Sequence, residues 1–225
     1  MLKAVIFDFD GLILDTELPE YLAWKEIFQR FGCSFPKKLW IDWIGNTTDV
    51  DYLIDLIEKQ SGRKVDPEVV QSEHLDRFQK MVEAQPVLPG VTKTLVEAHR
   101  LGLKLGLASS SSRAWVEGHL GRLGLLPYFE AIRTRDDVRT VKPDPELYLK
   151  VLKDLGVKPG EAIALEDSPN GLAAARAAGV FCIIVPSHLT EAEVFEGAGM
   201  RLRSLEELEL GAIALGGARH VPDGD

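Results

Sequence analysis

The feature that most constrains the fold is a series of short, mostly apolar runs that alternate with helical patterns. Such runs, without regular polar alternation, are typical of strands that are buried on both faces of a parallel sheet. They occupy residues 3–7, 103–108, 131–134, 162–165 and 181–185. Strand and helix patterns alternate from residue 88 onward. We therefore expect an α/β fold in which helices cover both faces of a parallel sheet.

Helix start signals lie between these runs. Ser112 is expected to cap one helix. Asp144 and Ser168 are further N-cap candidates, and each is followed directly by a proline. A side chain that accepts from free backbone N–H groups, followed by proline at the first helical position, is a typical helix start. These signals support the predicted alternation of strands and helices.

Residues 15–84 differ from the rest because they show helical patterns only. Apolar residues recur there at helical spacing in three stretches. These stretches are residues 21–31, 49–60 and 67–84. We therefore predict two domains. Residues 1–14 and 85–225 form the sheet domain, and residues 15–84 form a helical cap domain inserted after the first strand.

The charge of the chain limits its partners. The 225 residues carry a formal net charge of −9, which disfavours binding to nucleic acid or to an anionic membrane surface. No apolar run is long enough to span a membrane, and the first apolar run is interrupted at once by Asp8 and Asp10, unlike a secretory signal. We expect a cytoplasmic monomer that contacts neither nucleic acid nor membrane.

The tetrapeptide Asp8-Phe9-Asp10-Gly11 directly follows the first predicted strand. Ligands of open parallel sheets collect at the carboxyl ends of the strands, near a switch point. Two carboxylates two residues apart at a strand end point the same way and repel each other. A divalent cation relieves that repulsion, and hard oxygen ligands favour magnesium. The alternative is an aspartate pair that caps a turn at Gly11.

Two further polar clusters follow predicted strands. Glu166 and Asp167 add carboxylates at the same edge of the sheet, although a helix N-terminus that favours acids explains them equally well. Residues 109–112 are all serine. A hydroxyl with successive backbone N–H groups can hold a phosphate at such a position. Taken alone, a serine-rich helix start explains this run better.

Lys142 precedes Pro143 and is therefore disfavoured as part of the helix that follows. It could project into a site and neutralise phosphate oxygens, whereas in isolation a solvated surface lysine is the better explanation. The four clusters gain weight as a set, because three follow predicted strands and the lysine lies between two of them. Converging polar groups of this kind predict one reactive cleft.

These motifs resemble those of the haloacid dehalogenase-like (HAD) phosphatase superfamily. Residues 8–17 fit its first motif, Ser109 the second, Lys142 the third, and residues 166–167 the fourth. The chain is similar to the branch with an inserted helical cap, which includes β-phosphoglucomutase and related sugar phosphatases. The resemblance covers nearly the whole chain, and it implies a Rossmann-like, doubly wound parallel sheet.

The resemblance also implies a role for each acidic residue. Asp8 would be the nucleophile that becomes phosphorylated. Asp10 would be the general acid for the leaving alcohol and then the general base for water. Asp8, the main-chain carbonyl of Asp10, and Asp167 would hold Mg²⁺, with Glu166 assisting. The reaction implied is the hydrolysis of a small phosphate monoester, such as a phosphorylated sugar or similar metabolite.

The same resemblance implies a phosphate- and substrate-binding set. Ser109 and Lys142 would bind the transferring phosphoryl group and so belong to the catalytic residues. A loop in the cap segment would face the substrate, although a glycine turn between helices explains that loop as well. The predicted binding residues are Ser109, Ser110, Lys142, Gly45, Asn46 and Thr47.

Three other functions are weighed against the phosphatase. A β-phosphoglucomutase moves phosphate within a sugar and has a cap histidine where this chain has Glu20, a departure that favours water as the acceptor. A haloacid dehalogenase needs neither Asp10 nor a metal cage. A non-catalytic module on the same scaffold should have lost one of the motif residues, and all are present.

Overall fold

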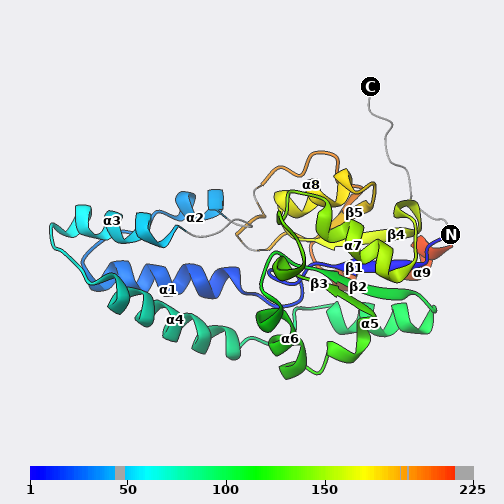
Figure 1. Cartoon of the computed structure of the whole chain (residues 1–225), viewed down its shortest axis with the longest axis horizontal. Coiled ribbons are helices and arrows are strands. Elements are labelled where there is room, and N and C mark those ends of the chain that lie inside the picture. The colour runs from blue at the N-terminus through cyan, green and yellow to red at the C-terminus, as the bar shows by residue number, and fades with distance from the viewer. Residues whose placement is uncertain (44–48, 188, 192, 216–225) are drawn as a thin grey trace. The chain divides into compact units, whose positions relative to one another are not determined.

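The structure, a computed structural model, describes residues 1–43, 49–187, 189–191 and 193–215. The chain forms two compact units. The first, here called the core, comprises Met1–Leu14 and Pro86–Asp225, and the second, here called the helical unit, comprises Asp15–Gln85. Each unit has its own secondary structure (Figure 1).

The core is built on a six-stranded parallel sheet with the order β3-β2-β1-β4-β5-β6. The strands are β1 (Ala4–Phe7), β2 (Lys104–Ala108), β3 (Ala131–Arg133), β4 (Ala162–Glu166), β5 (Phe181–Ile184) and β6 (Met200–Arg201). This order confirms the predicted doubly wound α/β sheet and puts the switch point between β1 and β4. All five predicted strands are present, and β6 was not predicted.

Helices cover both faces of this sheet (Figure 1). Those of the core are α5 (Val91–Arg100), α6 (Arg113–Arg122), α7 (Glu146–Leu155), α8 (Pro169–Ala177) and α9 (Leu210–Ala214). Apolar residues of α7 and α8 pack with Ala4 and Ile6 of β1 in one buried cluster. Gly106 of β2 permits this packing, because a Cβ there would lie 2.4 Å from Val151 of α7. The short helix α9 was not predicted.

The predicted caps of two core helices are confirmed, and the third is shifted. The Ser112 hydroxyl accepts from the Trp115 N–H at 3.3 Å, and the Ser168 hydroxyl accepts from the Gly171 N–H at 3.1 Å. Helix α7 begins one residue later than predicted, at Glu146. Asp144 still accepts from the Glu146 N–H at 2.9 Å, so its carboxylate satisfies the helix end from outside the N-cap position.

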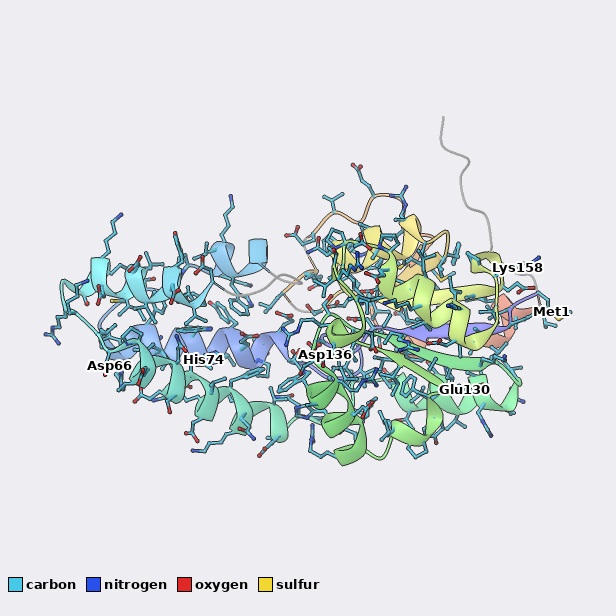
Figure 2. The ribbon with its side chains drawn as sticks, in the orientation of Figure 1. Met1, Asp66, His74, Glu130, Asp136 and Lys158 are labelled. Carbon is cyan, nitrogen blue, oxygen red and sulfur yellow. The ribbon has the colours of Figure 1, made fainter. Side chains whose placement is uncertain are left out.

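The helical unit contains α1 (Glu17–Arg30), α2 (Lys37–Trp43), α3 (Val50–Ser61) and α4 (Pro67–Glu83). Asp49 caps α3. Asp66, which is labelled in Figure 2, caps α4. His74 of α4 stacks on Trp24 of α1, with ring centroids 4.2 Å apart, and is almost fully buried. Burial lowers the pKa of His74 to about 4, so the ring is neutral at physiological pH.

The chain leaves the core after Leu14 and returns to it at Pro86. A β-bridge joins Leu14 to Val87, and the Leu88 N–H donates to the Ile13 carbonyl at 2.9 Å. The two ends of the excursion are therefore tied together by backbone hydrogen bonds within the core. Within the described residues, every helix is too short or too polar to cross a lipid bilayer.

Candidate active site

Asp8 follows the last residue of β1 and lies at the centre of the sheet edge. Phe7 is in register with Leu107 of β2 and with Leu165 of β4. The residues that directly follow these three therefore lie side by side at the carboxyl ends of the strands. The Asp8 N–H donates to the Leu165 carbonyl at 3.0 Å. This register brings Asp8 next to Glu166, and the Asp8 side chain is only 9% exposed.

Lys142 joins the two carboxylates. Its Nζ lies 2.5 Å from Asp8 Oδ1 and 2.6 Å from Glu166 Oε1, and all three side chains are buried. The Tyr148 hydroxyl, from α7, also donates to Glu166 Oε1. The Lys142–Pro143 peptide bond is cis. Because its Nζ contacts both carboxylates and its side chain is buried, the lysine points into the cluster of acids, and the surface alternative for it is wrong.

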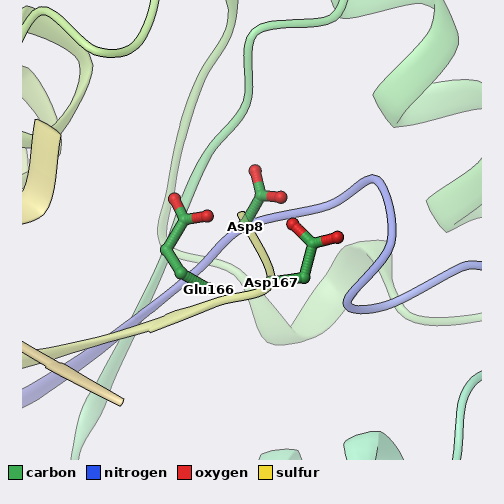
Figure 3. A group of neighbouring side chains, drawn as sticks. All are labelled: Asp8, Glu166 and Asp167. Atoms are coloured by element: carbon green, nitrogen blue, oxygen red, sulfur yellow. The ribbon is translucent and has the colours of Figure 1, made fainter. Parts of the chain in front are cut away.

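Asp8, Glu166 and Asp167 form an acidic group that could hold a metal ion (Figure 3). One carboxylate oxygen from each lies within 4.8 Å of the others. Burial raises the pKa of Asp8 to about 8. Repulsion from Glu166 and Asp10 also raises this pKa, and the attraction of Lys142 lowers it. Once Asp8 has lost its proton, the three carboxylates and Lys142 leave two excess negative charges, which one divalent cation would cancel.

The space around these oxygens also fits a cation. Glu166 Oε2 is buried and has no hydrogen-bond partner in the described part of the chain. Two glycines keep room next to the carboxylates. A Cβ at Gly11, where φ is +78°, would lie 2.1 Å from Asp167 Oδ2, and one at Gly171 would lie 1.8 Å from Glu166 Oε2. Buried carboxylate oxygens that carry excess negative charge are ligands that favour Mg²⁺.

Asp10 takes a different direction from Asp8. Its Oδ2 accepts from the Ser111 hydroxyl at 2.6 Å and lies 3.4 Å from the Ser109 hydroxyl, and its Oδ1 accepts from Trp115 Nε1 at 2.9 Å. The metal-binding group described above does not include its carboxylate. The remaining Asp10 group that could contact a metal is the main-chain carbonyl. Its contact with a metal stays a prediction.

The predicted phosphate-binding serines lie at the start of α6, after β2. Ser109 is fully buried, and its backbone N–H donates to the Arg133 carbonyl at 3.0 Å. Its hydroxyl accepts from the Ser111 N–H at 3.0 Å. The Ser110 hydroxyl is buried and has no partner among the described residues. The predicted cap residues Gly45, Asn46 and Thr47 lie outside the described residues.

Three residues of this site were missed by the sequence argument. Trp115 and Tyr148 lie within helices α6 and α7 and outside every motif discussed above, and Ser111 is one of four consecutive serines with nothing in the pattern to single it out. A signal existed for the two aromatic residues, because an indole N–H or a phenol hydroxyl usually finds a polar partner when it is buried.

The structure thus combines an α/β fold with a buried acidic group at the switch point of a parallel sheet. A family model described as haloacid dehalogenase-like hydrolase matches residues 5–185. The chain belongs to this family, as its motifs predicted, and it is an enzyme of the phosphatase type.

The relatives of the chain match it over almost its whole length. YhcW of Bacillus subtilis is 47% identical over 213 residues, which cover 95% of this chain and 96% of that protein. A phosphorylated carbohydrates phosphatase of Thermotoga maritima is 30% identical, with 95% and 94% covered. The crystal structure of β-phosphoglucomutase from Clostridium difficile superposes with a TM-score of 0.72 at 26% identity, covering 95% and 96%.

Proposed function

We propose that this chain is a Mg²⁺-dependent phosphatase that hydrolyses small phosphate monoesters through an aspartyl-phosphate intermediate on Asp8. The observation that carries the proposal is the buried group formed by Asp8, Lys142, Glu166 and Asp167 at the switch point. A carboxylate can approach a phosphate dianion only where positive charge screens both. This group contains one positive charge, that of Lys142, and its carboxylates could bind a second cation, Mg²⁺.

In the first half of the reaction, an Asp8 carboxylate oxygen bonds to phosphorus while the bond from phosphorus to the alcohol oxygen breaks. Asp10 gives its proton to that leaving oxygen. Lys142 holds Asp8 in place and neutralises phosphoryl oxygens together with the Ser109 hydroxyl. In the second half, water attacks phosphorus and the bond to Asp8 breaks, while Asp10 takes a proton from the water.

The metal would be held by Asp8, Asp167 and the Asp10 carbonyl, with Glu166 assisting. When bound, Mg²⁺ supplies the positive charge that lets the two anions meet. Because Glu166 already accepts from Lys142 and Tyr148, its main contribution is to orient the lysine.

The substrates proposed are phosphorylated carbohydrates or similar metabolites. Support comes from the Thermotoga maritima relative, whose name gives phosphorylated carbohydrates as its substrates. The helical unit is proposed to act as a cap domain that selects among them, with Gly45, Asn46 and Thr47 as contact residues. A monomeric state and a cytoplasmic location stay predictions.

A second candidate is phosphoryl transfer within a sugar phosphate. The likeness to a β-phosphoglucomutase structure favours it. Against it stands Glu20, which lies where the resemblance to β-phosphoglucomutase implies a cap histidine. Incubation with β-glucose 1-phosphate separates the two functions, because a mutase forms glucose 6-phosphate and a phosphatase releases glucose and phosphate.

The test of the proposed function is phosphate release from a panel of phosphorylated sugars and related metabolites, with Mg²⁺ and with a chelator. We expect release from several panel members and its loss on chelation, restored by added Mg²⁺. Asp76→Asn is a matched control, since Asp76 is an exposed aspartate that pairs with Lys80 on the surface of α4. Activity that survives complete metal removal would overturn the proposal.

A further inference from the structure

The carboxylate of Asp10 is held at both of its oxygens, and by different kinds of donor. Trp115 Nε1 donates to Oδ1 at 2.9 Å. On the other oxygen, Ser111 donates to Oδ2 at 2.6 Å and the Ser109 hydroxyl lies 3.4 Å away. The indole comes from α6, 105 residues further along the chain, and all of these residues belong to the core.

The position of the indole is fixed independently of Asp10. The Trp115 backbone N–H donates to the capping Ser112 hydroxyl at 3.3 Å. The His119 ring, one helical turn later, meets the indole edge to face with centroids 4.3 Å apart. His119 also stacks on Phe9, the neighbour of Asp10, at 6.3 Å. Because helix and stacking both hold the ring, its N–H is aimed at Asp10 before any substrate binds.

We infer that Trp115 is a positioning residue for the acid–base group of the reaction, an inference that rests on the proposed function of Asp10. An indole N–H donates and never accepts a hydrogen bond. Oδ1 is therefore always an acceptor, also when Asp10 carries its proton. The proton is then directed to Oδ2, whose neighbours are hydroxyls that both donate and accept.

The location of Oδ2 explains why the proton is needed on this oxygen. Oδ2 faces Ser109, the residue proposed to bind the transferring phosphoryl group. The oxygen that carries the proton is thus the one nearer to the phosphoryl site, where the leaving alcohol departs. Without the indole N–H, the carboxyl group could rotate and present either oxygen, so a smaller share of bound complexes would be ready for proton transfer.

The test is Trp115→Phe, which keeps an aromatic ring against His119 and removes the donor. The readout is kcat/KM for two leaving groups: the primary sugar phosphate that the wild type hydrolyses best in the panel, and p-nitrophenyl phosphate. The constant kcat/KM covers only the steps up to departure of the leaving group, and nitrophenolate departs without a proton. Trp24→Phe is the matched control, since the Trp24 Nε1 is buried without a partner among the described residues.

We expect Trp115→Phe to lower kcat/KM for the sugar phosphate about tenfold or more, a part of what a general acid contributes. Its kcat/KM for p-nitrophenyl phosphate should stay within about twofold, because that step needs no acid. Trp24→Phe should change the ratio of the two constants by less than about twofold, because it removes no contact to Asp10.

Equal losses for both substrates, or no loss for either, would refute the role of Trp115. Asp10→Asn distinguishes this failure from failure of the proposed function, because it should show the same leaving-group signature in stronger form. If Asp10→Asn hydrolyses both substrates like the wild type, the proposed function itself is wrong. Should Trp115→Phe not fold, β-(3-benzothienyl)alanine at position 115 keeps the shape without the N–H and is assayed in the same way.

Discussion

Removal of Mg²⁺ should destabilise this protein, and the effect should depend on pH. With Asp8 ionised, the acidic group at the switch point has two negative charges in excess of Lys142, so the proposed Mg²⁺ should bind the folded chain and not the unfolded one. At a hundred times the dissociation constant, this linkage adds about 2.7 kcal/mol of stability. For a chain of 225 residues, that amount raises the Tm by about 5–10 °C.

The pH dependence follows from Asp8. Its pKa is raised from 3.8 to about 8 in the metal-free fold, first by burial and then by Glu166 and Asp10. The folded chain therefore holds this proton more tightly than the unfolded chain does. The stability gained from it is complete below pH 4 and is lost as the pH rises toward 8. Because Mg²⁺ must displace the proton, its stabilising effect should grow by about 1.4 kcal/mol per pH unit between pH 6 and 8.

The assay is thermal unfolding with Mg²⁺ and with a chelator at pH 6, 7 and 8, together with calorimetry in two buffers that report proton release. Asp167→Asn should lose most of the Mg²⁺-dependent shift, and the exposed Asp76→Asn should keep it. A shift that is absent, or that is equal at all three pH values, would refute the electrostatic argument for the site.

Three shorter predictions concern single residues. Asp8→Asn should reduce phosphate release to background with unchanged circular dichroism, and substantial residual turnover would contradict covalent catalysis. Tyr148→Phe removes a buried donor to Glu166 and should lower the free energy of unfolding in urea by about 1–3 kcal/mol; an unchanged midpoint would count against that contact. Gly11→Ala brings a Cβ within 2.1 Å of Asp167 Oδ2 and should weaken Mg²⁺ binding in calorimetry about tenfold or more, whereas wild-type affinity would show that the loop adjusts.

Much of the core could be predicted because its strands are buried on both faces. Continuous apolar runs identify such strands, and the carboxyl ends of parallel strands must meet at one edge. That rule was enough to bring Asp8 and Glu166 together. The two-residue strand β6 and the short helices α2 and α9 carry too few residues to show a period, so their formation depends on packing that a sequence pattern does not express.

The contacts of the site were harder to predict than its members. Whether Lys142 points outward or inward depends on the backbone that precedes α7, and the same residue type suits both. Trp115 satisfies the apolar period of α6 and also donates to Asp10. A periodic pattern classes each residue as either apolar or polar. It therefore overlooks an aromatic side chain that has both an apolar ring and a polar donor.

The bridge between Leu14 and Val87 has a consequence for how such enzymes can diversify. The backbone leaves the core and returns to it at neighbouring points. The core can therefore form all of its own contacts whatever the length of the polypeptide inserted between these points. A different insert could be grafted there without altering the strand order or the arrangement of the acidic group at the switch point. Under the proposed function, new selectivity would then arise by exchange of the inserted unit, while the core would keep the hydrolytic chemistry.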